Sequence, residues 1–253
     1  MIPNVFHFIF GLEKKFGNKP FSIFHYLAIK SVLINNNPDK ICFYYKYEPY
    51  GIWWDKIKGS IEKISVSVPR KIFGNKLYHY AHKSDVLRLL ILIKFGGIYL
   101  DMDTICIQSF SSLLNHQCVM GEERFQGNVC GLCNAVILST KESEFLRSWI
   151  DTYRYFRSTG YDRYWGEHSV KIPLLLARKI PEKIHIETDR SFFYPSYTEE
   201  DLERLFVKCE NFPNAFLFHL WESKSYEKYL LNLSEEYIKS VDTSYNSIAR
   251  RYF

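Results

Sequence analysis

Short apolar runs alternate with longer segments of helical apolar spacing along the first hundred residues. The runs are aromatic or β-branched and end near glycine, asparagine or proline, which predicts strands, and the longer segments predict helices. The predicted strands are residues 5–10, 41–45, 61–66 and 98–100, and the predicted helices are residues 21–35 and 84–95. Because strands and helices alternate, we expect an α/β protein whose sheet carries helices on its faces.

The second half of the chain continues the pattern less regularly. It predicts a strand at 134–138, a helix at 143–156 capped within 140–143, a last core strand at 215–220, and amphipathic helix after Ser223. Residues 158–178 begin aromatic and end helical, so we expect a small helical or lid insertion around 141–180. A chain of 253 residues suits one domain, and we expect residues 1–253 to form it.

Composition and charge exclude several classes of protein. The net charge of +5 comes from Lys and Arg spread along the chain, without the dense blocks of a nucleic-acid-binding arm, so we expect no nucleic-acid partner. No apolar run approaches the roughly 20 residues that span a bilayer, and residues 2–10 lack the flanks of a signal peptide. We therefore expect a cytoplasmic protein, and its mild positive charge is compatible with peripheral contact with a membrane.

The six cysteines are scattered, and in a cytoplasmic protein we expect them to be reduced. Cys130 and Cys133 form one CxxC pair. A structural zinc site normally requires a second pair or suitably spaced histidines. The sequence therefore favours free cysteines over zinc ligands.

Candidate chemistry concentrates in residues 84–104, which read SDVLRLLILIKFGGIYLDMDT. Ser84 suits a helix cap, and the apolar residues after it surround the helix, which predicts a buried helix. The two glycines then end the helix and let the chain reverse into a strand. Ten helical residues span about 15 Å, and the following strand returns a similar distance. Asp101 and Asp103 are therefore expected beside Asp85 and Arg88.

This convergence would place carboxylates and a guanidinium at a strand's carboxyl end, where open α/β sheets bind ligands. Strand residues two apart face the same way, so Asp101 and Asp103 are expected to share a cation such as Mn²⁺ or Mg²⁺. Arg88 suits a phosphate or sugar oxygen. The simpler alternative is a structural Asp85–Arg88 ion pair beside a solvated turn. The combination of SDxxR, the glycine pair and DxD favours a functional site.

The same segment resembles the DXD-motif sugar transferases of glycosyltransferase family 32. That group includes capsular polysaccharide transferases and mannosyltransferase-like enzymes and is distantly similar to the glucosylating clostridial toxins. The opening IPNVFHFIFG and the closing FHLWESKSY are similar to the family's first strand and last segment. The resemblance implies a GT-A type fold with a mixed, mostly parallel sheet, manganese dependence and transfer with retention of configuration. It also implies a nucleotide-sugar donor, UDP rather than GDP, and a glycan or other hydroxyl acceptor.

By position in this resemblance, Asp103 binds the metal directly and Asp101 contacts the metal and the ribose or sugar. Asp85 holds sugar hydroxyls, and Arg88 contacts the donor sugar or phosphate. Tyr99 falls where the family has an aromatic residue near the donor, with plain packing as the alternative.

Further candidates lie at the two ends of the chain and in its middle. Phe10 stands where relatives often carry a tryptophan that stacks on the donor base, and Trp221 is assigned to the donor as well. His219 and Ser223 are candidate metal ligands, with a buried structural histidine as the alternative for His219. The candidate acceptor contacts are Asn134, Trp165, Glu167 and His168, with a solvated loop as the alternative for Glu167 and His168.

Two other functions fit parts of the sequence. Asp101, Asp103 and Thr104 match the DxDxT motif of phosphatases resembling haloacid dehalogenases, although those usually carry it on the first strand. An inactive carbohydrate-binding relative is the second alternative. The intact Asp101, Asp103 and Arg88 argue against such decay.

Overall fold

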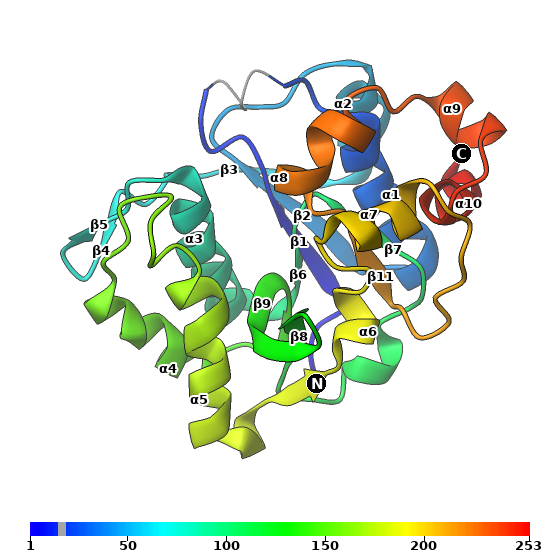
Figure 1. Ribbon diagram of the computed structural model, residues 1–253. Helices are drawn as coiled ribbons and strands as arrows, with labels where there is room; N and C mark the ends of the chain where they lie inside the picture. Colours follow the sequence, from blue (N-terminus) through cyan, green and yellow to red (C-terminus); the bar gives the residue numbers. More distant parts are fainter. Residues whose placement is uncertain (15–18) are drawn as a thin grey trace.

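A seven-stranded mixed sheet forms the centre of the protein, with helices packed on both of its faces (Figure 1). The computed structural model describes residues 1–14 and 19–253. In order across the sheet, the strands are β10 (His185–Glu187), β8 (Cys118–Phe125), β9 (Asn128–Ser139), β6 (Gly97–Leu100), β1 (Val5–Ile9), β2 (Lys40–Tyr45) and β3 (Glu62–Ser65). Only β9 runs antiparallel to its neighbours β6 and β8, and the other four pairings are parallel. The expected α/β class with a mostly parallel sheet is confirmed.

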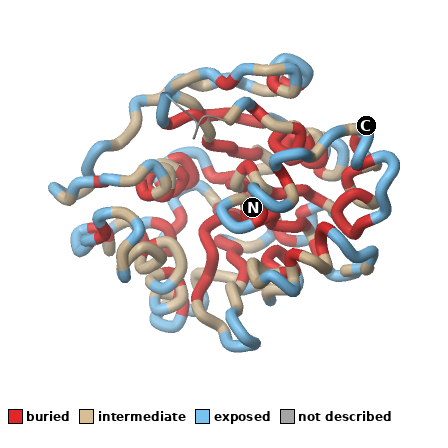
Figure 2. The backbone as a smooth tube through the Cα atoms, turned by 45° about the horizontal axis from the view of Figure 1, so that its top comes forward, coloured by how far each residue is buried: buried red, intermediate tan, exposed pale blue. Residues whose placement is uncertain are grey.

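Alternating side chains divide the sheet between two hydrophobic cores. Phe6 and Phe8 of β1 belong to the core shared with α1 (Ile23–Asn36) and α2 (Ile52–Ile57). Val5 and Ile9 belong to the core shared with three other helices. These are α3 (Tyr80–Phe95), α4 (Glu144–Thr152) and α5 (Ile172–Lys179). The buried segments run through the middle of the molecule between these layers (Figure 2).

The C-terminal part adds short elements around α1. Its helices are α6 (Asp189–Phe192), α7 (Glu199–Phe206), α8 (Glu222–Ser225), α9 (Glu235–Ser240) and α10 (Ser244–Ala249). The strand β11 (Leu217–His219) pairs with β7 (Thr104–Cys106), and β4 (Lys71–Ile72) pairs with β5 (Asn75–Lys76). Single turns of 3₁₀ helix occupy Lys58–Ser60, Ser111–Leu113, Tyr153–Tyr155, Pro181–Lys183 and Arg250–Tyr252, and π-helical turns occupy Glu167–Lys171 and Tyr226–Leu230. Among the described residues, no helix is both long and apolar enough to cross a bilayer.

Three predicted elements differ from the structure. Helix α3 begins at Tyr80 rather than Ser84, because the His79 ring accepts the Ala81 N–H (3.2 Å) and caps the helix one turn earlier. The last predicted strand, 215–220, is confined to β11 and pairs with β7 outside the central sheet. The strand predicted at 134–138 is one half of β9, and its partner β8 was not predicted.

Candidate active site

Two glycines turn the chain from α3 into β6. Gly96 and Gly97 both have positive φ, 68° and 109°, a region that favours glycine. A Cβ on Gly97 would lie 2.5 Å from the Val5 carbonyl oxygen, and one on Gly96 would lie 2.6 Å from the Lys141 nitrogen. The His7 Nε2 atom bonds the Gly96 carbonyl oxygen at 2.8 Å. This tight reversal returns the chain along α3 and sets where β6 ends.

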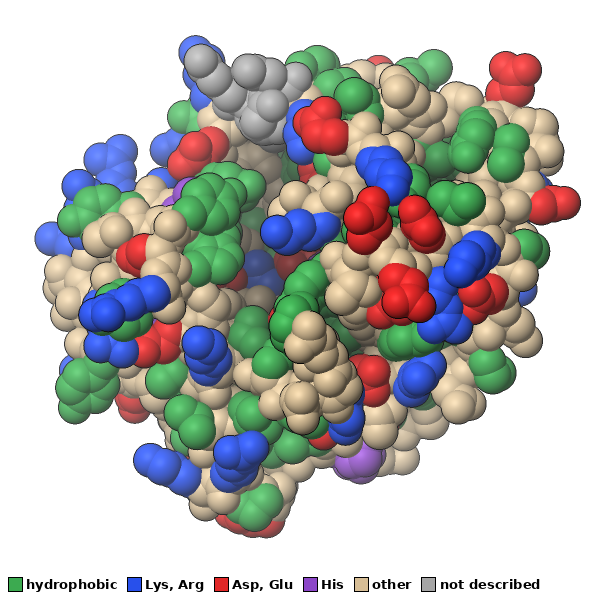
Figure 3. Space-filling model, in the orientation of Figure 1, with side chains coloured by type: hydrophobic (Ala, Val, Ile, Leu, Met, Phe, Trp, Pro, Cys, Tyr) green, Lys and Arg blue, Asp and Glu red, His purple; other side chains and the backbone are tan. Residues whose placement is uncertain are grey.

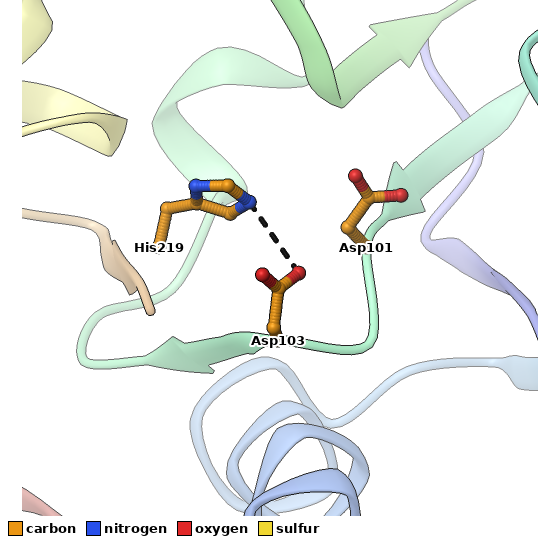
Figure 4. Close-up of side chains that lie close together, drawn as sticks. All are labelled: Asp101, Asp103 and His219. Atoms are coloured by element: carbon orange, nitrogen blue, oxygen red, sulfur yellow. Dashed lines mark ion pairs between the residues drawn. The ribbon is translucent and has the colours of Figure 1, made fainter. Parts of the chain in front are cut away.

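The aspartates lie in a turn rather than on a continuous strand. Strand β6 ends at Leu100, and β7 begins at Thr104. The Thr104 hydroxyl donates to the Asp101 carbonyl oxygen at 2.8 Å and closes the turn. The prediction that strand alternation aligns the two carboxylates was therefore wrong in its mechanism. The turn itself brings Asp101 and Asp103 together with His219, with one ligand atom from each within 4.8 Å of the others (Figure 4).

His219 approaches from β11, where it lies opposite Thr104 in the ladder with β7. Its Nε2 atom is 3.4 Å from the Asp103 Oδ1 atom, and the Glu222 N–H donates to Oδ2 at 2.8 Å. Burial favours the neutral acid, but His219 and the hydrogen bonds outweigh it and lower the pKa of Asp103 to about 2. Burial likewise opposes the charge of His219, but Asp103 raises its pKa on balance. Within the described chain, the buried His219 Nδ1 atom has no hydrogen-bond partner.

Arg88 is buried, and its guanidinium makes three hydrogen bonds and two further ion-pair contacts. Nη1 donates to the Asn134 carbonyl oxygen at 2.7 Å and lies 3.1 Å from Asp101 Oδ1. Nε and Nη2 face the Ser84 carbonyl and hydroxyl oxygens at 3.4 and 3.2 Å, and Nη2 lies 3.4 Å from Asp85 Oδ1. Because only 5% of Arg88 is exposed, little of its guanidinium is open to a donor substrate. Its ion pairs hold the Asp85 and Asp101 carboxylates in place.

Tyr99 contacts both Asp101 and Arg88. Its hydroxyl donates to Asp101 Oδ1 at 2.5 Å, and the Arg88 guanidinium lies 4.4 Å from its ring centroid. Only 1% of Tyr99 is exposed, so its ring is covered by protein rather than presented to a donor. Burial raises the pKa of Asp101, Arg88 opposes this, and the charge of Asp103 adds to it. Two neighbouring carboxylates with opposite pKa shifts are the pattern that a shared cation would relieve.

The Asn134 side chain contacts Asp85, a partner of Arg88. Its amide donates to Asp85 Oδ1 at 2.8 Å, and both residues are buried. The amide that was expected to orient an acceptor sugar is thus engaged by Asp85.

Three donor or metal candidates lie at the rim of this cluster. The Phe10 ring follows β1 and contacts His25 and Phe21, with ring centroids 4.8 and 5.5 Å apart. Trp221 is buried, packs edge-on against His219 at 4.2 Å, and donates its ring N–H to the Pro195 carbonyl oxygen. It therefore fixes the His219 ring. Ser223 is exposed and lies on α8.

The aromatic segment before α5 is only partly available to a ligand. Trp165 stacks with Tyr161 at 4.4 Å and packs on the His79 and His82 rings. Glu167 is paired with Arg157. His168 is buried, 4% exposed, and its ring bonds the Thr152 carbonyl oxygen, which removes it from any acceptor surface. Of these three, Trp165 is the one whose neighbours leave an aromatic surface open, through the exposed Tyr161.

Two glutamates near the cluster were missed from the sequence. Glu123 on β8 is partly buried, and its charge raises the pKa of His219. Burial in turn raises the pKa of Glu123. In the described part of the chain, no Lys, Arg or His nitrogen lies within 4 Å of its carboxylate, and the Cys130 thiol is a donor to it at 3.9 Å. Glu222 links Asp103, through its N–H, to Lys19, through a 3.0 Å ion pair.

The cluster lies between α3, whose Arg88 pairs with Asp101, and α8, whose Glu222 N–H binds Asp103. The space-filling view shows a hollow of the surface between α3 and α8 (Figure 3). Acidic and basic side chains lie at its bottom, and hydrophobic side chains line one of its sides. Such a concave site with convergent polar groups suits a small polar ligand.

Known proteins similar to this chain point to one chemistry. The family described as the glycosyltransferase sugar-binding region containing the DXD motif matches residues 26–120. The glucan organizing enzyme 1 of Cryptococcus neoformans var. grubii is 34% identical over 265 aligned residues, which cover 100% of this chain and 71% of that protein.

Solved structures agree in fold. A glycosyltransferase GlyE of Streptococcus pneumoniae TIGR4 has a TM-score of 0.54 at 15% identity over 99% of this chain and 63% of that one. Mouse xyloside xylosyltransferase 1 has a TM-score of 0.52 at 13% identity, covering 87% of this chain and 99% of that one. The GT-A type fold is thereby confirmed, and the phosphatase alternative loses its support. The chain is a glycosyltransferase and belongs to the family whose sugar-binding region contains the DXD motif.

Proposed function

We propose that this glycosyltransferase holds a divalent metal ion, Mn²⁺ or Mg²⁺, and transfers a sugar from a nucleoside-diphosphate donor to a hydroxyl acceptor. The observation that carries the proposal is the convergence of Asp101, Asp103 and His219, with one ligand atom from each within 4.8 Å of the others. Carboxylate and imidazole ligands in this number leave room for waters and substrate phosphates around Mn²⁺ or Mg²⁺.

The residues present fit such an ion. Asp103 is held ionised, and one of its oxygens faces His219. Asp101 stands within reach of the same point and is fixed by Tyr99 and Arg88. The bound ion would neutralise charge that develops on the diphosphate as it leaves. The protein's part is to keep the ligands preorganised, since dipoles and charges already in place cost no reorganisation during reaction.

We propose UDP as the nucleotide, with Phe10 beside the base and Asp85 beside the sugar hydroxyls. The choice of UDP follows from the family, in which compact members more often use it. Phe10, at the end of β1, can stack on a base but does not indicate which one. Retention of anomeric configuration is proposed from the family as well. Proton NMR of the first product formed tests it, because inversion would give the opposite anomer.

On the acceptor side, we propose that Glu123 accepts a hydrogen bond from an acceptor hydroxyl. Burial raises the pKa of Glu123, and a titratable group with a perturbed pKa beside a polar cluster is a candidate functional group. Gly121, two residues earlier on β8, packs against Phe193, which in turn contacts His219. These contacts, and the charge interaction of Glu123 with His219, support a role for Glu123 near the cluster.

We also propose that residues 1–253 act as one catalytic domain. Residues 141–180 would then be part of the helical layer, since α4 packs against both α3 and α5. Among them, Tyr161 and Trp165 offer an aromatic surface on which a sugar ring of the acceptor can stack.

A thermal-shift panel of nucleotide sugars, with and without Mn²⁺, tests the donor and the metal together. A ligand at a concentration of 100 times its Kd stabilises the folded state by about 2.7 kcal/mol. We expect a UDP-sugar to raise Tm only when Mn²⁺ is present, and Asp103→Asn to abolish the shift. Equal shifts without metal, or donor binding without any transfer or donor hydrolysis, would contradict the proposal, and the latter would favour an inactive carbohydrate-binding protein.

A further inference from the structure

The β4–β5 hairpin places two like charges opposite each other, which destabilises it locally. Lys71 lies directly opposite Lys76 in its short ladder. Like charges in directly opposed positions of an antiparallel pair destabilise it. No carboxylate of the described residues lies within 4 Å of either ammonium group, and the sequence has no acidic residue between Glu62 and Asp85.

The tip of this hairpin adds a second cost. Phe73 has φ of 47° and is followed by Gly74 with φ of 88°. Asparagine or glycine is the residue expected at such a position, and a bulky side chain there is strained. Phe73 is also 45% exposed, so burial of its ring does not offset the backbone strain.

The residues packed beside the hairpin add another cation and another exposed aromatic ring. The Asn75 side chain bonds the carbonyl oxygens of Tyr153 and Arg154, both at 2.9 Å, and so fixes the hairpin to the 3₁₀ turn after α4. The Arg154 guanidinium lies 4.2 Å from the Phe73 ring centroid, and Tyr155 is 80% exposed. One carboxylate, Asp151, lies 3.6 Å from Arg154.

The hairpin surface, defined here as Lys71, Phe73, Lys76, Tyr78, Arg154 and Tyr155, therefore combines exposed cations with exposed aromatic rings. Lys76 lies 4.5 Å from the Tyr78 ring centroid, and Tyr78 is 50% exposed. This pairing of cations with rings suits the interface of an anionic bilayer, where cations meet lipid phosphates and rings enter the headgroup region.

We propose that the hairpin surface docks the enzyme on an anionic lipid membrane. Lipid phosphates would relieve the repulsion between Lys71 and Lys76, and Phe73 would be buried at the tip. The hairpin protrudes at the edge of the molecule (Figure 1), and after residues 77–79 the chain enters α3, which carries Asp85 and Arg88. A docked enzyme would thus work beside the membrane surface. This inference does not depend on the donor or metal proposed above.

Co-sedimentation with vesicles tests it. The purified chain is mixed with phosphatidylcholine vesicles and with vesicles that also contain phosphatidylserine, at near-physiological salt. We expect binding to the second kind only. Lys71→Glu should weaken it about 25-fold, at about fivefold for each of the two charge units changed. Phe73→Gly should weaken it about tenfold through the lost ring.

Both variants should remain folded, because Lys71→Glu creates a cross-strand ion pair with Lys76 and glycine suits the positive φ at position 73. Their Tm should equal or exceed that of the wild type, and transfer to a soluble acceptor should be unchanged. The matched control is Lys208→Glu, the same charge change at an exposed lysine beyond α7. Lack of wild-type binding, full binding by Lys71→Glu, or an equal loss in Lys208→Glu would overturn the proposal. Binding to a polyanionic glycan such as heparin but not to vesicles would overturn it too.

Discussion

Replacing Arg88 by leucine distinguishes a positioning residue from one that binds the donor. The change leaves Asp85 and Asp101 without their buried cation and removes the donor to the Asn134 carbonyl oxygen. Removal of one partner from a buried ion pair costs about 3–5 kcal/mol. A protein of this size loses about 2–4 °C of Tm per kcal/mol, so we expect Tm to fall by roughly 6–20 °C.

The assay combines thermal unfolding of the ligand-free protein with steady-state kinetics at a temperature where the variant is folded. Arg154→Leu, at a side chain that is 58% exposed, is the control and should change the free energy of unfolding by less than about 0.5 kcal/mol. An unchanged Tm for Arg88→Leu, together with a raised KM for the donor, would refute the positioning role. It would restore the direct donor contact that the family resemblance implies.

Three further changes test other parts of the site. Gly97→Ala should disrupt the turn between α3 and β6, because its Cβ would lie 2.5 Å from the Val5 carbonyl oxygen. A loss of 1 kcal/mol lowers Tm by about 2–4 °C in a protein of this size, so a Tm within about 2 °C of wild type would contradict this. Burial lowers the pKa of His7 from 6.5 to about 4, so the unfolded chain binds a proton that the folded one does not. The free energy of unfolding should therefore fall, by up to about 3 kcal/mol, as pH drops from 6.5 towards 4. Urea titrations at several pH values should show a smaller change of the free energy of unfolding with pH for His7→Gln than for wild type. Glu123→Gln should lower kcat and raise the acceptor KM while donor binding persists, whereas Glu122→Gln, which loses only a surface pair with Arg124, should behave as wild type.

The core of the site could be predicted from the sequence because the residues that form it are close together along the chain. The helix, the glycine pair and the strand of residues 84–104 adjoin along the chain, so helical rise and strand rise already bring Asp101 back beside Arg88. The position of His219 could be suggested because it ends an apolar strand near a polar turn. The α1 and β1–β3 region was also readable, since each element is a separate apolar run.

The remaining features depend on contacts between distant residues. The hydrogen bonds of Arg88 to Asn134 and Ser84 depend on where these residues lie in the folded chain, which no sequence spacing encodes. Strand β8 ends in charged residues, Glu122 to Arg124, so its apolar pattern is cut short, and Glu123 went unnoticed with it. Helix α3 starts early because His79 caps it, and imidazole is an uncommon cap.

Isothermal titration of Mn²⁺ into the protein with UDP present tests the account most directly. Wild type should bind one ion per chain, and Asp103→Asn and His219→Ala should each weaken that binding at least tenfold while remaining folded. Glu122→Gln should bind the ion as wild type does. Unchanged Mn²⁺ affinity in folded Asp103→Asn would contradict a metal site at this turn.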